Sequence, residues 1–240
     1  MQHIVVVSVV GVGLVGSELV DQLTNLPSPG IRDQFQLLSL SSSRSTVYHE
    51  IGRGWQLDWR KDLATAGVES DSRALVTRLT QISTVEEVAG LREGVSFSVI
   101  PVLVDNTSSE DVARLYPFFL SNGINIVTPN KKAFSSELAL YEEIVTTSLR
   151  TGARFYNEST VGAGLPIIST IKDLVATGDK VRDLRPPAGL LFHIASRGLI
   201  RSPGHEGRGR VLGHTELYFQ RLLGWEERTR TKLLFYRFDR

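Results

Sequence analysis

An apolar segment followed at once by closely spaced glycines constrains the fold of this chain more than any other feature. Residues 4–10 form a run rich in β-branched side chains, which is typical of a strand buried on both faces of a parallel sheet. The glycines that follow have the spacing GxGxxG, and the next segment carries apolar residues at helical spacing. A strand, a glycine-rich turn and a helix in this order are the context of a dinucleotide-binding unit.

Each of the three glycines has its own role in such a unit. Gly11 permits the tight turn, Gly13 lets the backbone approach a pyrophosphate, and Gly16 lets the helix pack closely on the strand. The pyrophosphate would lie at the positive N-terminus of the helix. The alternative is a turn closed by glycines that binds no ligand, but the flanking strand and helix favour cofactor binding.

Composition indicates a water-soluble protein. The chain has 240 residues, of which 41% are hydrophobic and 22% charged, so it can bury a substantial core. It contains no cysteine, which excludes disulfides and thiolate metal sites. No segment approaches the length of about 20 apolar residues that a membrane span requires. The first strand also begins too early to leave room for a signal peptide. We therefore expect a cytoplasmic protein without membrane contact.

The end of the second predicted strand bears on the choice of cofactor. Residues 35–40 form this strand, and hydroxyl side chains and Arg44 follow it, with no carboxylate before Glu50. At this place an acidic residue holds the ribose 2′-hydroxyl of NAD, whereas an arginine accommodates the 2′-phosphate of NADP. We therefore predict that NADP(H) is preferred, with NAD(H) as the second option. The alternative is an ordinary solvated arginine.

Two further strands are predicted to end in polar residues. The strand at 95–104 is expected to be interrupted or bulged at Pro101, because proline donates no hydrogen bond to a ladder. Residues 105–109 (Asp-Asn-Thr-Ser-Ser) follow it and precede a helix predicted at 110–121. The carboxyl edge of such a sheet is where α/β folds bind ligands, although these residues can equally cap the helix.

The next strand, at 124–127, leads into Thr-Pro-Asn-Lys-Lys. Lysines in a loop are usually solvated, but at this edge of the sheet a lysine can contact a phosphate or the nicotinamide side of a cofactor. Ser135 is predicted to cap a helix at 137–150, which Gly152 ends.

The last strand, at 154–157, leads into a glycine-rich loop that contains Glu158, followed by a helix at Ile167–Ala176. One carboxylate together with backbone carbonyls is a ligand set for a hard cation. The alternative is a second tight turn with a glutamate of no special role.

Taken together, these motifs resemble homoserine dehydrogenase, most closely the fungal, monofunctional type. The resemblance extends from residue 4 to about residue 181 and is carried by residues 10–16, 104–109, 128–136, 158–168 and 177–179. It implies an α/β fold with a Rossmann-type, doubly wound parallel sheet that binds NAD(P)H in residues 1–181. It also implies an oxidoreductase that interconverts aspartate 4-semialdehyde and L-homoserine in threonine and methionine biosynthesis.

The resemblance assigns individual residues as well. Val12, Leu14 and Val15 match positions that line the pyrophosphate, and Thr107 and Lys132 match cofactor contacts. With the glycines and Arg44, the predicted cofactor-binding residues are Gly11, Val12, Gly13, Leu14, Val15, Gly16, Arg44, Thr107 and Lys132. A sodium ion is implied at Glu158, Val161, Ala163 and Leu165, in part through backbone oxygens.

Residues 182–240 do not continue the resemblance. They hold 12 lysines and arginines against 6 acidic residues, whereas residues 1–181 hold 15 against 20. In the family, this region forms a substrate-binding and dimerisation domain that supplies an aspartate and a lysine, and that pair is not found here. We interpret residues 182–240 as an atypical, arginine-rich tail that is either poorly ordered or the product of an altered gene model. The chain is therefore predicted to be a truncated form of weak or no activity, without the segment that forms the family's homodimer.

The alternative function is a non-catalytic dinucleotide-binding module with a basic tail. Net positive charge and the Gly-Arg-Gly-Arg sequence at 207–210 support a tail that binds nucleic acid. Its aromatic residues match no RNA-recognition signature. Nucleic acid is therefore not the expected partner, and the resemblance implies a small-molecule substrate instead.

Overall fold

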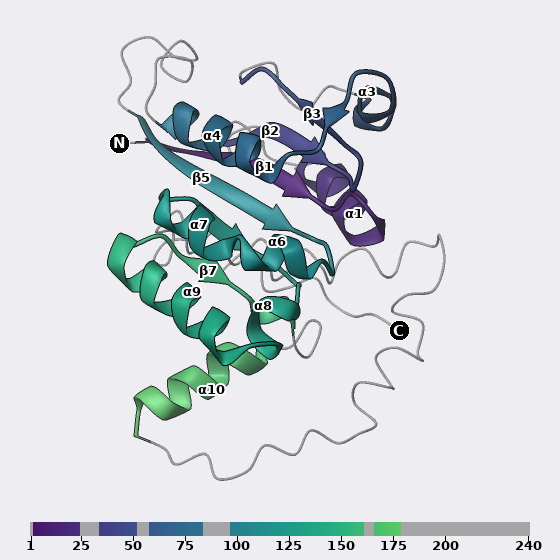
Figure 1. Ribbon diagram of the computed structural model, residues 1–240. Coiled ribbons are helices and arrows are strands. Elements are labelled where there is room, and N and C mark those ends of the chain that lie inside the picture. Colours follow the sequence, from purple (N-terminus) through teal and green to yellow (C-terminus); the bar gives the residue numbers. More distant parts are fainter. Residues whose placement is uncertain (1, 25–33, 52–57, 84–96, 161–165, 179–240) are drawn as a thin grey trace, which may run out of the picture.

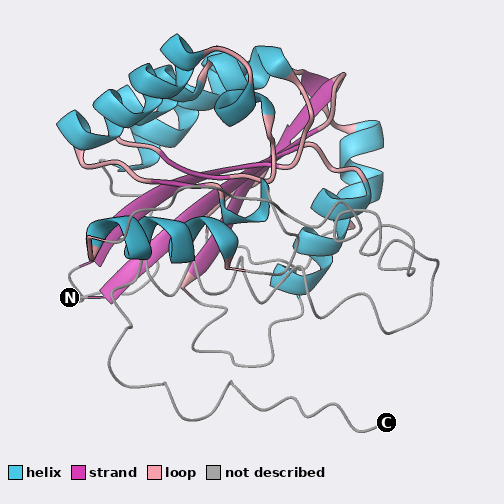
Figure 2. Ribbon diagram, turned by 90° about the horizontal axis from the view of Figure 1, so that it is seen from below, coloured by secondary structure: helices cyan, strands magenta, loops and turns pink. Residues whose placement is uncertain are grey.

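The computed structural model describes residues 2–24, 34–51, 58–83, 97–160 and 166–178, which form a sheet covered by helices on both faces (Figures 1 and 2). The strands are β1 (Gln2–Val10), β2 (Phe35–Ser41), β3 (Ser45–Tyr48), β4 (Val68–Glu69), β5 (Phe97–Asp105), β6 (Asn125–Val127) and β7 (Phe155–Tyr156). The helices are α1 (Leu14–Thr24), α3 (Trp59–Thr65), α4 (Ser72–Ser83), α6 (Glu110–Arg114), α7 (Tyr116–Ser121), α8 (Lys132–Ser135), α9 (Leu138–Thr151) and α10 (Ile167–Ala176), with a 3₁₀ turn η1 at Glu158–Thr160. None of these helices has both the length and the apolar character that a bilayer crossing requires.

The sheet confirms the α/β class but is mixed instead of wholly parallel. Its strand order is β4-β3-β2-β1-β5-β6-β7, and the pairs from β2 through β7 are parallel. β3 runs antiparallel to both β2 and β4. The cause is a tight turn after β2, in which the Ser42 hydroxyl oxygen accepts the Ser45 backbone N–H at 2.9 Å. This turn sends the chain directly back along β2, where a parallel neighbour would need a long crossover.

Alternation along β1 explains why helices cover both faces of the sheet. Val5, Val7 and Val9 pack on one face against Leu19, Val20 and Leu23 of α1 and against Trp59 of α3. Ile4 and Val6 pack on the opposite face, where the core also contains residues of α4, α7 and α9. Because successive side chains of a strand point to opposite faces, a run with apolar residues on both faces is buried on both sides. The prediction of a doubly buried first strand is therefore confirmed.

The expected interruption of β5 at Pro101 is wrong. β5 pairs with β1 without a register shift, and Val6 lies opposite Pro101. On its other side, β5 pairs with β6 only from Val102 onward, and the Pro101 carbonyl accepts the Asn125 Nδ2 hydrogen at 3.1 Å. The N and C=O of a strand residue face the same neighbour, so the missing N–H of Pro101 faces the side where β6 has not yet begun.

Two local predictions about helices are also wrong. The helix expected at 110–121 is split into α6 and α7 at Leu115. Pro117 has no N–H to donate to the carbonyl of Ala113, so a continuous helix would lack a bond there. Ser135 does not cap the next helix. It ends α8 and donates its hydroxyl to the Lys131 carbonyl, and α9 begins after Glu137 without a side-chain cap.

Candidate functional site

Four turns meet at the carboxyl edge of the parallel strands, and they carry most of the predicted cofactor-binding residues. They follow β1, β2, β5 and β6, which are neighbours in the sheet. Backbone hydrogen bonds join the first three: the Gly11 N–H donates to the Ser41 carbonyl at 2.8 Å, and the Asn106 N–H donates to the Val10 carbonyl at 2.8 Å. These three turns are thus held at fixed distances from one another before any ligand binds.

The turn after β1 has the geometry that the glycine spacing predicts. Gly11 has a φ of 87°, and a Cβ there would lie 2.7 Å from Cγ2 of Thr107. At Gly16 a Cβ would lie 1.9 Å from the carbonyl oxygen of Gly11. These two glycines are therefore required by the fold itself.

Gly13 differs from the other two glycines, because a Cβ at this position would have no protein atom within 4 Å. Its backbone is exposed at the N-terminus of α1, an 11-residue helix whose first N–H groups have no partner within the helix. Leu14 and Val15 beside it are 85% and 43% exposed. An open backbone next to free helical N–H groups fits the pyrophosphate of a dinucleotide.

A buried amide nitrogen, which the sequence does not reveal, is a second indication of a ligand here. Nδ2 of Asn106 is buried and has no hydrogen-bond partner among the described residues. It lies 3.4 Å from the Cβ position of Gly16, beside the glycine turn. Buried amide groups are nearly always paired, so this atom is a candidate donor to a bound group. Sequence alone identified the polar segment at 105–109, but which of its side chains faces the glycine turn depends on the fold.

Thr107 lies in the turn after β5, and Lys132 is the first residue of α8, directly after the turn that follows β6. The Thr107 N–H donates to Oδ1 of Asp105 at 2.7 Å, and the Lys132 N–H donates to Oδ1 of Asn130 at 3.0 Å. Ser109 caps α6 by accepting the Val112 N–H, so the residues at 105–109 combine the capping role with a place at the ligand edge. The Lys132 side chain is exposed.

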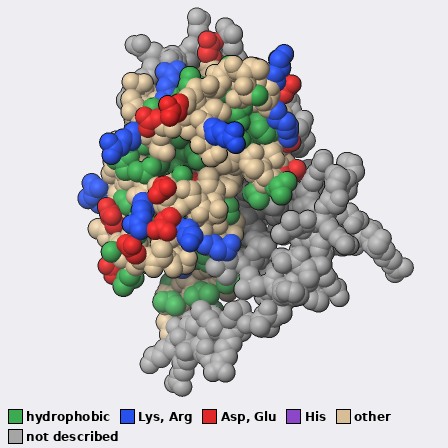
Figure 3. Space-filling view, turned by 45° about the vertical axis from the view of Figure 1, so that its right-hand side comes forward, with side chains coloured by type: hydrophobic (Ala, Val, Ile, Leu, Met, Phe, Trp, Pro, Cys, Tyr) green, Lys and Arg blue, Asp and Glu red, His purple; other side chains and the backbone are tan. Residues whose placement is uncertain are grey.

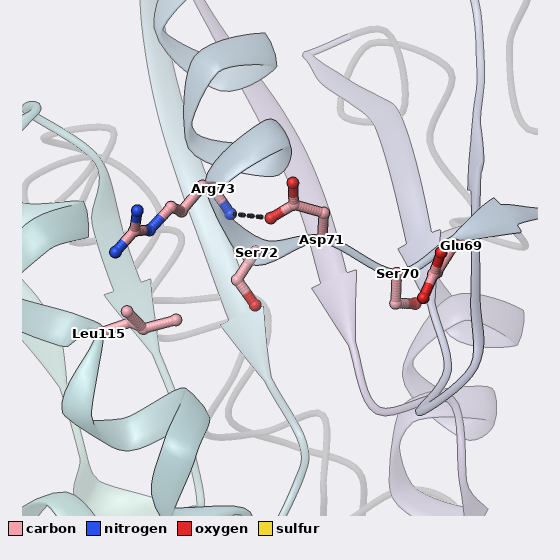
Figure 4. A pocket seen from close by; sticks show the side chains of 6 residues that line it. All are labelled: Glu69, Ser70, Asp71, Ser72, Arg73 and Leu115. Carbon is pink, nitrogen blue, oxygen red and sulfur yellow. Dashed lines mark hydrogen bonds between the residues drawn. The ribbon is translucent and has the colours of Figure 1, made fainter.

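Arg44 lies at the tip of the turn between β2 and β3, and its side chain is exposed. The Arg44 carbonyl accepts the Ser70 N–H at 3.2 Å, so this turn is attached to the segment after β4. A pocket opens there, lined by Glu69, Ser70, Asp71, Ser72 and Arg73 together with Leu115 (Figure 4). The pocket contains none of the predicted site residues.

Glu158 is buried, and its carboxylate is bound to the N-terminus of α10. Its Oε1 accepts the Ile168 N–H at 2.8 Å, and its Oε2 accepts the Ser169 N–H at 2.9 Å. This is a favourable place for a negative charge, because the N-terminal N–H groups of a helix carry partial positive charge. The other three residues of the implied sodium site, Val161, Ala163 and Leu165, lie outside the described residues.

The predicted tail, residues 182–240, also lies outside the described residues, so the proposed boundary at 181 and the alternative of a basic tail stay predictions. On the face drawn in Figure 3, the lysines and arginines of the described part are interspersed with aspartates and glutamates. This face has no extended basic surface of the kind that binds nucleic acid.

Comparisons with known proteins agree with the geometry of the site. A family model described as homoserine dehydrogenase, NAD binding domain, matches residues 11–158. Homoserine dehydrogenase of Paracoccidioides brasiliensis is 41% identical over 177 residues, which are 72% of this chain and 44% of the relative. The enzyme of Saccharomyces cerevisiae is 36% identical over 182 residues, 75% of this chain and 46% of the relative. This chain therefore spans less than half the length of these two relatives.

Solved structures show the same fold. A protein of unknown function from Candida auris is 35% identical and aligns with a TM-score of 0.55 over 75% of this chain and 46% of that chain. A hyperthermophilic archaeal homoserine dehydrogenase mutant in complex with NADPH aligns with a TM-score of 0.51 at 20% identity, over 73% of this chain and 50% of that chain. From its family match and these relatives, the chain belongs to the homoserine dehydrogenase family, and its matched part is the NAD(P)-binding domain.

Proposed function

We propose that this chain binds NADP(H) at the carboxyl edge of the sheet, as the cofactor-binding part of an enzyme that interconverts aspartate 4-semialdehyde and L-homoserine. The observation that carries the proposal is the open backbone at Gly13, which adjoins the N-terminus of α1. Membership in the homoserine dehydrogenase family supports the reaction, and the unpartnered Nδ2 of Asn106 supports a ligand at this edge.

From the order of the strands we infer the direction in which the dinucleotide lies. Arg44 follows β2, the glycine turn follows β1, and Thr107 and Lys132 follow β5 and β6. With the 2′-phosphate at Arg44 and the pyrophosphate at the glycine turn, the nicotinamide lies toward Thr107 and Lys132. The adenosine half thus lies on the side of the sheet that carries the pocket beside Ser70.

The preference for NADP(H) is tested by substituting Arg44→Ala and titrating the full chain with NADPH and NADH. Loss of a charged hydrogen bond costs about 1.5–3 kcal/mol, so we expect NADPH to bind roughly 10- to 150-fold more weakly. NADH affinity should stay unchanged, because NADH carries no 2′-phosphate. Isothermal titration calorimetry measures both dissociation constants.

Arg150→Ala is the matched control. Arg150 is also exposed, but it lies in the last turn of α9, whereas Arg44 follows a strand at the cofactor edge. Its loss changes the net charge equally and should leave both dissociation constants as they are. Equal affinity of the unmodified chain for NADPH and NADH would contradict the proposed preference.

We also propose a sodium ion at the loop that contains Glu158, Val161, Ala163 and Leu165. Only Glu158 among these lies in the described part of the chain, and its carboxylate already accepts two N–H groups of α10. Its backbone carbonyl is therefore the oxygen that we propose for the cation. Carbonyl oxygens of this kind are suitable ligands for a hard cation.

A further inference from the structure

A fully satisfied polar cluster is buried beneath the cofactor edge. Its members are Asp105, Tyr116, Thr128 and Asn130, hereafter the Asp105 cluster, and their exposed fractions are between 0% and 2%. The Tyr116 hydroxyl donates to Oδ2 of Asp105 at 2.6 Å and lies 2.9 Å from Oγ1 of Thr128. Nδ2 of Asn130 donates to the same Oδ2 at 3.0 Å, and the Thr128 hydroxyl donates to the Asp105 carbonyl at 2.8 Å.

The Asp105 cluster is bonded directly to the two turns that carry the proposed nicotinamide contacts. Asp105 accepts the Thr107 N–H through Oδ1, and Asn130 accepts the Lys132 N–H through its own Oδ1. Asn130 also donates to the Ser109 carbonyl at 2.9 Å, which ties the turn after β6 to the turn after β5. Both turns therefore depend on the same carboxylate.

Tyr116 is the member of the cluster that lies on a helix, as the first residue of α7. Burial raises the pKa of its hydroxyl well above the ordinary value, and the charge of Asp105 acts in the same direction. The hydroxyl therefore keeps its proton and donates to Asp105. Its ring belongs to the apolar core with Phe119 and Leu120, so α7 is a rigid support for this donor.

A buried carboxylate is an expensive way to stabilise a core. Apolar residues of similar volume often give equal or greater stability, which suggests that a buried ionic group serves another purpose. Here each carboxylate oxygen has a partner, and the partners lead to Thr107 and Lys132. The arrangement matches a support that fixes the orientation of a binding site.

We propose that Tyr116 is a positioning residue: by donating to Asp105, it holds the turns after β5 and β6 so that Thr107 and Lys132 meet the nicotinamide half of the cofactor. This inference rests on the proposed function, because it assumes that these turns contact the nicotinamide half. It adds a residue that does not itself touch the cofactor.

Tyr116→Phe in the full chain tests the proposal, since it keeps the ring and removes only the hydroxyl. Dissociation constants are measured for NADPH and for 2′,5′-ADP, which carries adenosine with its 2′- and 5′-phosphates but lacks the nicotinamide half. We expect the NADPH constant to rise roughly tenfold, within the range for loss of a charged hydrogen bond, and the 2′,5′-ADP constant to change less than about twofold. Tyr141→Phe on α9, where the side chain is 38% exposed, should change neither constant.

Several outcomes would overturn the proposal. If both ligands weaken equally, the hydroxyl supports the whole fold and not the nicotinamide half. If neither ligand weakens, the hydroxyl does not position the site. Should Tyr116→Phe fail to fold, Thr128→Val removes another hydroxyl of the Asp105 cluster without a change of shape, and Thr128→Ser restores it. For Thr128→Val we expect NADPH to bind more weakly while the affinity for 2′,5′-ADP stays the same. For Thr128→Ser we expect the affinity for NADPH to recover.

Hydrogen exchange separates failure of this inference from failure of the proposed function. In Tyr116→Phe, the amides of Thr107 and Lys132 should exchange faster than in the unmodified chain, with amides of β1 unchanged. If the unmodified chain binds neither ligand, the proposed function is wrong, while the exchange rates still show whether Tyr116 holds the two turns. Unchanged exchange at both amides would overturn the positioning role.

Discussion

Two glycines in one turn have opposite constraints, although the sequence motif treats them alike. A Cβ at Gly16 would lie 1.9 Å from a backbone oxygen, whereas a Cβ at Gly13 would meet no protein atom within 4 Å. The fold therefore requires Gly16, and we infer that the cofactor requires Gly13. A single methyl group added at Gly13 should therefore affect cofactor binding, whereas one added at Gly16 should affect folding.

We predict that Gly13→Ala folds normally but binds NADPH at least roughly tenfold more weakly, a loss of about 1.4 kcal/mol or more. Its free energy of unfolding should be unchanged or higher by about 0.4–1 kcal/mol, as for other compatible glycine-to-alanine changes. Gly16→Ala should lose about 1–3 kcal/mol or more of stability, because the clash is with backbone. Urea unfolding and NADPH titration measure the two effects. Unaltered NADPH affinity in Gly13→Ala would show that the pyrophosphate does not approach this backbone.

At the residue scale, features that depend on neighbouring residues could be predicted from the sequence, and features that depend on residues far apart in the chain could not. The geometry of the turn glycines could be predicted because it depends on spacing within one turn, and so could the position of Arg44, because it follows the end of one strand. The Asp105 cluster could not, because the hydrogen bonds between its side chains join positions 11 to 25 residues apart in the chain. Asn106 was inside a recognised motif, yet only the fold shows that its amide faces the glycine turn.

At the scale of elements, α10 is attached to the domain by its first turn. None of its residues is classed as buried, and Leu174 and Val175 are 42% and 57% exposed. The bonds from Glu158 to the Ile168 and Ser169 N–H groups are thus a main attachment, with Lys172 over the ring of Phe155 at 5.7 Å as another contact.

We predict that Glu158→Ala weakens this attachment and removes the response to sodium. Loss of the charged hydrogen bonds should lower the free energy needed to detach α10 from the domain by about 1.5–3 kcal/mol. The amides of α10 should therefore exchange hydrogen faster, in sodium chloride and in choline chloride alike. Sodium chloride should raise the melting temperature of the unmodified chain above its value in choline chloride, because a ligand of the native state stabilises it. The variant, whose loop has lost its anchor, should show no such rise. An identical sodium response in both proteins would mean that the cation lies elsewhere or does not bind.

Helices and strands could be predicted where the pattern of apolar residues and the residues that end an element, such as glycine, indicated the same boundaries. The range of α10 was predicted correctly, and the left-handed Gly152 ends α9 as expected. The break between α6 and α7 was missed, because the apolar pattern continues through Pro117. The short strands β3 and β4 were not predicted either, since two to four residues carry too little pattern to reveal pairing with a distant segment.

At the scale of the whole molecule, the proposed function assigns the described domain one part of a hydride-transfer reaction. Reduction of a carbonyl by NADPH requires a bound cofactor, a pocket for the rest of the substrate and a proton donor for the developing alkoxide. In the proposed function, the carboxyl edge of the sheet provides the first. Lys131, Lys132 and Glu158 lie near that edge, but none matches the lysine that the family uses for proton transfer, and the matched part covers less than half of the relatives' length.

We therefore predict that the chain of 240 residues binds NADP(H) but oxidises homoserine very slowly. Loss of a general acid or base alone lowers a rate by roughly 10²- to 10⁴-fold, and loss of substrate positioning lowers it further. The assay follows NADPH formation from homoserine and NADP⁺ at alkaline pH, with the full-length Saccharomyces cerevisiae enzyme as the reference. A rise in melting temperature with NADPH, measured on the same preparation, shows that the protein is folded and binds the cofactor. Turnover within about tenfold of the reference would contradict the prediction and would mean that residues 182–240 supply a substrate pocket and a proton donor after all.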